Sequence, residues 1–215
     1  GLKKLVTTIR TLPERRSYFA FLLSSLFYRD GLNALYTFGG IYAAGVLGLS
    51  VTQVGIFGII AALAGVFGAL IGGKMDKRFG PKPVVGFSCF VLVVACLLVV
   101  STTQSYVFFA IPVAAESSAP LITFYIAGTL IGAFGGAIQA ASRTLLVHQV
   151  EHDEVTEAFG LYAFSGRATT FIGPLSVAAV TAWTGSQQLG ISPVVILMLL
   201  GLIGLFFVKQ KGSAQ

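Results

Sequence analysis

The chain has 215 residues, of which 55% are apolar and only 10% are charged. A soluble domain carries about 25% charged residues, so this chain lacks the polar surface of a water-soluble body, and we expect an integral membrane protein. Its formal net charge of +6 does not indicate a nucleic-acid-binding protein, because the basic residues flank apolar stretches and form no patch with aromatic residues.

Six apolar stretches are long enough to cross a bilayer as helices, which takes about 20 mostly apolar residues each. A polar and basic lead-in (1–17) precedes them, and a polar tail (209–215) follows them. The predicted spans are residues 18–46, 52–73, 84–101, 120–147, 158–183 and 191–208. We therefore expect an all-α bundle of six transmembrane helices.

The distribution of basic residues orients these spans. Twelve of the 14 Lys and Arg residues fall in segments on one side, and the other two, Arg29 and Arg167, lie inside spans. Because basic segments remain on the cytoplasmic side, the pattern predicts that both termini are cytoplasmic.

Small residues recur at every fourth position in two of the spans. The fourth span has Gly128, Gly132, Gly136 and Ala140, and the second has Ala64, Gly68 and Gly72 beside the row Ala61, Gly65, Ala69 and Gly73. Such ladders let helix backbones approach closely. They predict tightly packed helix pairs that can slide or rock.

Ionisable side chains near the middle of the first span are the main candidates for function. At 100° per residue, Arg29, Asp30, Asn33, Tyr36 and Thr37 fall within a stripe of roughly 120°. Charged groups at this depth are costly and usually face a cavity or a partner. The face could line a water-filled path, with Asp30 carrying a proton or cation and Arg29 binding an anion. The alternative is a structural ion pair with another helix.

Arg167 in the fifth span is the candidate partner for such a pair, because it is expected at a similar depth to Asp30. It could equally bind an anionic substrate, and the sequence leaves both readings open. Farther along the same span, Gly173 and Pro174 could loosen the helix and free a carbonyl group, or form a passive kink.

Two loops of opposite charge are expected on the cytoplasmic side. The loop between the second and third spans is basic, and the loop after the fourth span is acidic. The two could form a gating latch, or they could simply be solvated. The candidate gating residues are Gly73, Asp76, Lys77, Arg78, Gly80, Lys82, Glu151, Glu154 and Glu157.

Enzymatic and metal sites find little support. The segment Ala163-Phe-Ser-Gly166 lacks the preceding glycine of an intramembrane serine protease motif. His148 and His152 have a spacing that can bind metal, but no third ligand accompanies them. We therefore expect no enzyme activity, no metal and no cofactor.

The basic loop carries a resemblance to a known family. Gly73-Lys-Met-Asp-Lys-Arg-Phe-Gly-Pro-Lys82 resembles the Gly-x-x-x-Asp-Arg-x-Gly-Arg-Lys signature of the major facilitator superfamily, which lies between the second and third helices of each six-helix half. When the glycines are aligned, Lys77 occupies the place of the family's acid and Asp76 comes one residue early. This departure puts the latch role of Asp76 in question.

Three further segments resemble the vacuole-effluxer-like branch of that superfamily, whose fungal members are associated with amino-acid efflux. They are Tyr28-Arg-Asp-Gly-Leu-Asn-Ala-Leu-Tyr36, Gln139-Ala-Ala-Ser-Arg-Thr144 and Glu157-Ala-Phe-Gly-Leu-Tyr-Ala-Phe-Ser-Gly-Arg167. The resemblance implies the C-terminal six of twelve helices, built as a 3+3 repeat, with a central site and alternating access. It also implies that spans one and four line the cavity and that spans two and five face the missing half.

From these patterns we expect half of a secondary transporter for a small polar solute, with amino acids as one candidate class and a proton as one candidate coupling ion. The expected solute or proton pathway comprises Arg29, Asp30, Asn33, Tyr36, Gln139 and Arg167. Its expected partners are the lipid bilayer, the solute, and either an N-terminal half or a second copy, and its expected location is the bacterial cytoplasmic membrane. The alternatives are a six-helix membrane scaffold without transport and a half-size transporter that works as a homodimer.

Overall fold

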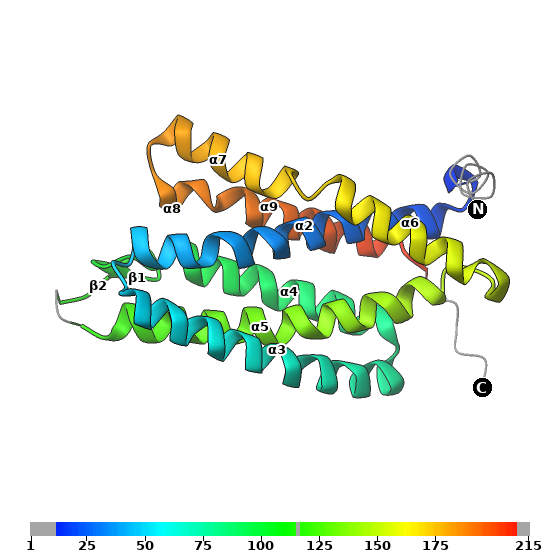
Figure 1. Ribbon diagram of the computed structural model, residues 1–215, viewed down its shortest axis with the longest axis horizontal. Helices are drawn as coiled ribbons and strands as arrows, with labels where there is room; N and C mark the ends of the chain where they lie inside the picture. Colours follow the sequence, from blue (N-terminus) through cyan, green and yellow to red (C-terminus); the bar gives the residue numbers. More distant parts are fainter. Residues whose placement is uncertain (1–11, 115–116, 210–215) are drawn as a thin grey trace.

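The computed structural model describes residues 12–114 and 117–209, which form an up-and-down bundle of helical rods (Figure 1). The bundle includes one small antiparallel hairpin, in which Tyr106 pairs with Pro112. In chain order the elements are η1 (Leu12–Glu14), α2 (Arg16–Gly45), α3 (Val51–Phe79), α4 (Pro81–Val100), β1 (Tyr106–Val107), β2 (Ile111–Pro112), α5 (Ala119–Val147), η2 (His152–Glu154), α6 (Val155–Ala168), α7 (Ile172–Thr184), α8 (Gln187–Gly190) and α9 (Ser192–Phe206).

Four of the six expected spans are helices long and apolar enough to cross a membrane. They are α3, α4, α5 and the stretch Gln187–Phe206, which contains α8 and α9. α2 is longer, with 30 residues, but Arg29, Asp30 and Asn33 lower its hydropathy. The remaining expected span, 158–183, is divided into α6 and α7. The predicted helical membrane class is therefore confirmed for the described residues.

The charged block after the second predicted span is helical and is not a loop. α3 continues six residues beyond the predicted end at position 73 and stops at Phe79. Lys77 and Arg78 lie in its last turn, where positive charge is favourable against the helix dipole. Only Gly80 links α3 to α4, and its φ of 83° suits a residue without a Cβ. Pro81 then begins α4 at a position where its missing N–H costs nothing.

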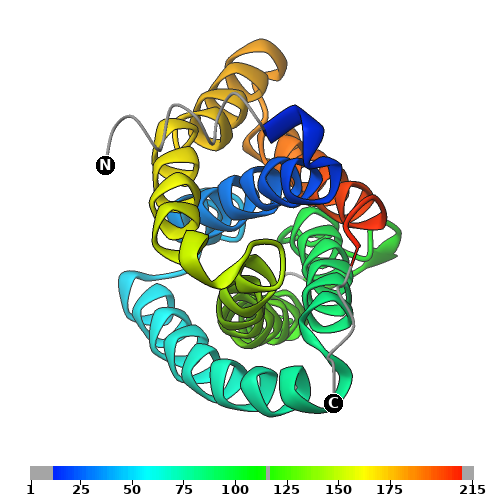
Figure 2. The ribbon, with the colours of Figure 1, turned by 90° about the vertical axis from the view of Figure 1, so that its right-hand side faces the viewer.

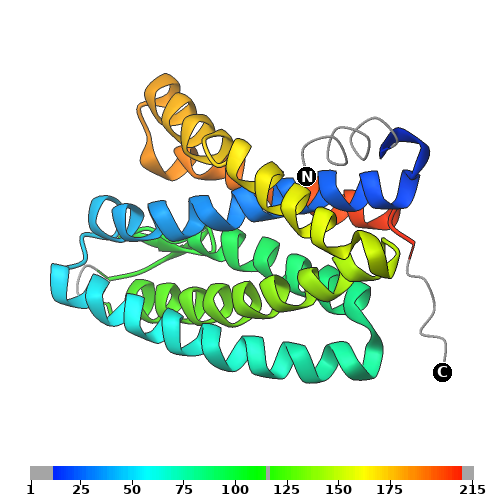
Figure 3. The ribbon, with the colours of Figure 1, turned by 45° about the vertical axis from the view of Figure 1, so that its right-hand side comes forward.

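The fifth predicted span breaks between Ala168 and Ile172. Pro174 lies in the first turn of α7, where proline is tolerated, but it cannot donate a hydrogen bond to the preceding turn. Thr169 and Thr170 donate their side-chain hydroxyls to the carbonyl oxygens of Ser165 and Arg167 at 3.1 and 2.8 Å. These bonds satisfy the exposed end of α6, so the break is an ordered feature, and the bent α6–α7 rod runs along α2 (Figure 3).

The two small-residue ladders pack against each other, as α3 and α5 lie side by side (Figures 1 and 3). A Cβ placed on Gly68 would lie 1.9 Å from the carbonyl oxygen of Ala133, and one on Gly132 would lie 2.1 Å from that of Ala61. The predicted close helix pair is thus confirmed. Among its described residues, α3 buries only Gly68, Gly72 and Asp76, so most of its surface is left uncovered.

One end of the bundle gathers both ends of the described chain and the α3–α4 turn (Figure 2). Arg15 pairs with Glu154 from the α5–α6 connection, and Lys82 donates to the carbonyl oxygen of Val208 at 2.5 Å. We call this the basic end. The predicted placement of the basic segment beside the chain ends is therefore confirmed, whereas the side of the membrane that it faces remains a prediction.

The opposite end carries the hairpin, whose turn is unusual. Phe108 and Phe109 have φ angles of 55° and 62°, which bulky side chains rarely adopt. Both rings are more than half exposed. Exposed aromatic side chains of this kind are typical of the membrane–water interface.

Candidate functional site

The polar face of α2 divides into two parts in the structure. Arg29 lies about 20 Å along a helix about 45 Å long, which places it near mid-depth. Asp30 is fully buried and Arg29 is half-buried, whereas Asn33, Tyr36 and Thr37 are exposed. The first two side chains meet the broken α6–α7 rod, and Tyr36 borders a groove.

Arg29 is held by the last turns of α6. Its Nη1 donates to the carbonyl oxygen of Tyr162 at 2.8 Å, and its guanidinium carbon lies 4.1 Å from the centre of the Tyr162 ring. A Cβ on Gly166 would lie 2.3 Å from Arg29 Nη2, so only glycine leaves room for the guanidinium. The cation is thus held by α6, with no hydrogen bond to Asp30 among the described residues.

Asp30 faces the break between α6 and α7. Its Oδ1 accepts a long hydrogen bond of 3.3 Å from the hydroxyl of Thr169, and its Oδ2 is buried with no hydrogen-bond partner in the described chain. The backbone there is also tightly packed, since a Cβ on Gly173 would lie 2.9 Å from the carbonyl oxygen of Asp30. The carboxyl group is therefore buried, with the Thr169 hydroxyl as its hydrogen-bond partner in the described chain and the charge of Arg29 close by.

The ion pair between Asp30 and Arg167, one of the two readings of the sequence, is absent among the described residues. Arg167 is exposed on α6, and the hydrogen-bond donor to the acid is the Thr169 hydroxyl. Residue spacing placed the two charges at a similar depth, but the break after Ala168 turns the chain so that the threonine faces α2.

A buried hydroxyl cluster lies close to Arg29 and was not predicted. The Tyr28 hydroxyl and Ser142 Oγ are 2.7 Å apart, and Ser142 also donates to the carbonyl oxygen of Ile138. The Tyr162 ring that stacks on Arg29 lies close to the same cluster. These contacts join α2, α5 and α6 at mid-depth. The sequence gives no periodic signal for them, because each residue comes from a different helix.

A groove of about 630 Å³ lies between α2, α3 and α5. Most of its wall is apolar or small, and its polar side chains are Tyr36, Gln139 and Arg143. The Tyr36 hydroxyl lies over Gly135 and faces Gln139. Arg143 was not among the site residues expected from the sequence. Its position four residues after Gln139 places both on one face of α5, and this spacing could have identified it.

The candidate gating residues of the α3–α4 turn differ in exposure and in their contacts. Lys77 and Arg78 are exposed, and Lys82 is engaged with the end of α9. Asp76 is buried one turn beyond Gly72 on the surface that packs against α5, and its Oδ1 has no hydrogen-bond partner in the described chain. The buried acid of this turn is thus Asp76, and Lys77 points away. Gly80 forms the turn described above, whereas Gly73 is half-buried within α3, where a Cβ would meet nothing within 4 Å.

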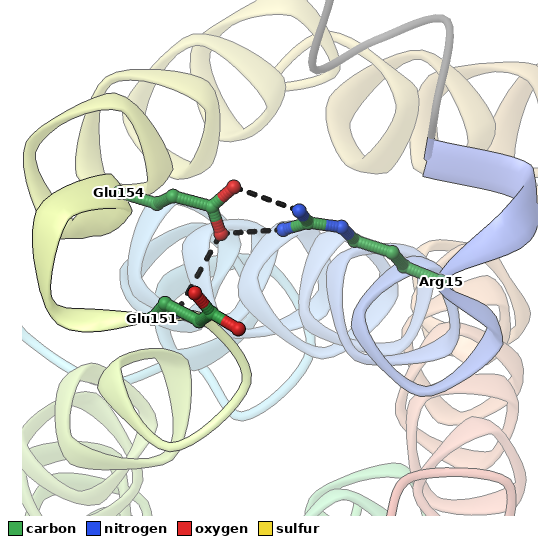
Figure 4. A network of polar contacts seen from close by, with 3 residues as sticks. All are labelled: Arg15, Glu151 and Glu154. Atoms are coloured by element: carbon green, nitrogen blue, oxygen red, sulfur yellow. Dashed lines mark hydrogen bonds and ion pairs between the residues drawn. The ribbon is translucent and has the colours of Figure 1, made fainter.

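The acidic connection is bound by the start of α2. Arg15 makes two hydrogen bonds to the carboxylate of Glu154, one of 2.7 Å to Oε1, and Glu151 lies beside them (Figure 4). The hydrogen bond that Arg15 donates to Glu154 raises the pKa of the Arg15 guanidinium. Glu157 is half-buried in the first turn of α6. Within the described ranges, the ion pair to this connection comes from Arg15. A latch between this connection and the basic α3–α4 turn stays a prediction.

Metal ligands do not gather in the part of the chain that the structure describes, where no three His, Cys, Asp or Glu side chains come together. His152 is exposed in η2, and His148 is half-buried after α5. The polar groups at mid-depth are instead an arginine, a carboxyl group and hydroxyls, which can bind a polar solute or carry a proton.

Comparison with known proteins supports this interpretation. The family model described as "Vacuole effluxer Atg22 like" matches residues 1–215. The chain is 26% identical over 215 residues to the uncharacterized MFS-type transporter YxiO of Bacillus subtilis, covering all of this chain and 46% of the relative. It is 25% identical over 187 residues to autophagy-related protein 22 of Cryptococcus neoformans, covering 85% of this chain and 31% of the relative. The chain thus spans less than half the length of these curated relatives. It belongs to the vacuole effluxer Atg22-like family, a family of MFS-type membrane transporters and not of enzymes.

Proposed function

We propose that this chain is the C-terminal half of a secondary transporter that moves a small polar solute by alternating access, with amino acids as the solute class and protons as the coupling ion. The observation that carries the proposal is the groove between α2, α3 and α5. There Tyr36, Gln139 and Arg143 place a phenol, an amide and a cation on walls that are otherwise apolar. A bilayer-embedded groove with a few convergent polar groups is the form that solute sites take in helical transporters.

Asp30 is the proton carrier in this proposal. An ionised carboxylate is costly when it is buried. Asp30 has one long hydrogen bond, from Thr169, in the described chain, and the charge of Arg29 lies close by. Binding a proton removes that cost while the carboxyl group is buried. Opening of its surroundings to water favours release of the proton.

The α6–α7 break supplies the moving part. Arg29 binds the carbonyl oxygen of Tyr162 in α6, and the next residue, Asp30, contacts Thr169 in the break itself. A bend at residues 169–171 would change the surroundings of Asp30 while Arg29 stays attached to α6. The protonation state of one carboxyl group is thereby linked to the angle between α6 and α7. Arg167, exposed on α6, and Asn33, exposed on α2, are proposed to meet the solute in another state of this cycle.

The uncovered surface of α3 is consistent with a second bundle. Since α3 buries only three of its described residues, the remaining surface can pack on an N-terminal half, with the six rods of this chain forming a 3+3 repeat. In this arrangement the basic end is cytoplasmic, the membrane is the bacterial cytoplasmic membrane, and the α3–α4 turn with the acidic connection gates the cytoplasmic side.

The test is solute exchange by the full-length protein in proteoliposomes, screened with a mixture of radiolabelled amino acids. Gln139→Ala removes a groove amide and is expected to reduce exchange at least about tenfold, the loss of one hydrogen bond to a charged solute. Thr129→Val is the matched control, because Thr129 lies on the same helix outside the groove. Equal exchange by wild-type protein and Gln139→Ala, or loss of exchange in both variants, would remove the groove from the proposal.

A homodimeric half-size transporter is the second candidate, and the same uncovered α3 surface favours it. Ile59 and Leu63 are exposed on α3, at 63% and 56%. Cysteines at these positions would cross-link to a second copy in membranes if the dimer forms. Cross-links to an N-terminal half of the same polypeptide would instead support the full-length arrangement.

A further inference from the structure

A second cavity lies at the basic end, well away from the groove. It has a volume of about 370 Å³ and lies between the start of α2, the connection after α5 and the residue at position 209. It shares no residue with the groove. Its lining consists of Arg15, Arg16, Ser17, Tyr18, Gln149, Val150, Glu151 and Lys209.

A ring of hydrogen bonds holds the wall of this cavity in place. The backbone N–H of Lys209 donates to Ser17 Oγ at 2.8 Å, and Ser17 Oγ donates to Gln149 Oε1 at 2.5 Å. Gln149 Nε2 then donates back to the carbonyl oxygen of Lys209 at 3.0 Å. Three segments that are far apart in the sequence are therefore joined, so the cavity is formed before any ligand arrives.

Several donors in the lining have no acceptor. Tyr18 is 1% exposed, yet its hydroxyl has no hydrogen-bond partner in the described chain. Buried polar groups of this kind are nearly always paired. Arg16 and the Lys209 ammonium are exposed and make no ion pair within the described residues. A missing acceptor of negative charge would satisfy all three groups.

The charge of the lining also favours an anion. Three cations, Arg15, Arg16 and Lys209, outnumber the two acids there, Glu151 in the lining and Glu154 beside Arg15 and Tyr18. Arg15 is already engaged by Glu154, which leaves Arg16, Lys209 and the Tyr18 hydroxyl for a ligand. Arginine and lysine beside a hydroxyl donor form a typical phosphate site.

We propose that this cavity binds the phosphate group of an anionic phospholipid. Tyr18 lies in the first turn of α2, where the helix enters the bilayer, so the cavity is at headgroup level. Basic pockets between membrane helices at this level bind acidic lipid headgroups. A bound headgroup would join α2, the α5–α6 connection and the end of α9, and would therefore stabilise the basic end.

The experiment measures thermal unfolding of the full-length protein in an uncharged detergent. Phosphatidylglycerol, phosphatidylcholine and inorganic phosphate are added in separate arms. Phosphatidylglycerol is expected to raise the unfolding temperature, and phosphatidylcholine is not. Tyr18→Phe removes only the hydroxyl, so the variant should fold normally and bind phosphatidylglycerol about tenfold more weakly, as expected for loss of a charge-assisted hydrogen bond.

Two further variants make the outcome specific. Arg16→Gln combined with Lys209→Gln should abolish the stabilisation, whereas Lys77→Gln, which removes an exposed charge at the same end, should leave it unchanged. Stabilisation by inorganic phosphate alone, sensitive to the same variants, would assign the site to free phosphate. Equal stabilisation by both lipids, or full stabilisation of Tyr18→Phe by phosphatidylglycerol, would overturn the proposal. The groove is intact in all of these variants, so failure here leaves the transport proposal untouched.

Discussion

Substitution of Gly68 by alanine tests the packing of α3 on α5. The new Cβ would lie 1.9 Å from the carbonyl oxygen of Ala133, whereas an ordinary contact begins at 3.4 Å. The two backbones would therefore have to separate by about 1.5 Å, because a carbonyl oxygen in a helix cannot turn away. Overpacking of this kind typically costs about 1–3 kcal/mol of folding free energy.

The matched control is Gly55→Ala in the same helix, where a Cβ would meet nothing within 4 Å. There the substitution should be neutral or stabilising by up to about 1 kcal/mol, since alanine favours the helix. Thermal unfolding followed by size-exclusion chromatography in detergent should show a folding free energy for Gly68→Ala that is about 1–4 kcal/mol less favourable than that of Gly55→Ala. Equal stabilities would refute the close ladder contact and the position of α3.

Two other outcomes follow from single contacts. Gly166→Ala puts a Cβ 2.3 Å from Nη2 of Arg29. Because the end of the arginine side chain can shift, we expect this variant to fold normally but to lose transport to a degree similar to Arg29→Gln. Wild-type transport by Gly166→Ala would contradict the assigned position of the guanidinium. A double-mutant cycle of Arg15→Gln and Glu154→Gln should give a coupling energy of about 0.2–1 kcal/mol that falls with added salt, since both side chains are more than a third exposed. A larger coupling that salt does not weaken would show that this pair is shielded from solvent.

The helical rods and the close helix pair could be predicted from the sequence because both depend on local patterns. Apolar length predicts a span, and small residues four apart predict a close contact. The end of α3 could not be predicted from hydropathy, because Lys77 and Arg78 end the apolar stretch without ending the helix. Helix termination there depends on the backbone of Gly80, whose φ of 83° ends α3.

The division of the polar face of α2 depends on tertiary packing. A helical stripe placed Arg29, Asp30 and Tyr36 together, but the bend after Ala168 decides which of them meet α6 and α7. Pro174 indicated a weak point in that span, whereas the position of the break was set by the threonine hydroxyls that satisfy the end of α6. Arg15 as the partner of Glu154 also required the three-dimensional arrangement, since the two lie 139 residues apart.

The most direct test of the transport account is proton-driven uptake by Asp30→Asn in proteoliposomes. Asparagine keeps the size of the side chain and can still accept the hydrogen bond from Thr169, so folding and solute exchange without a gradient should survive. The account predicts that a pH gradient no longer drives accumulation of the solute in this variant. Undiminished accumulation that still follows the pH gradient would contradict it.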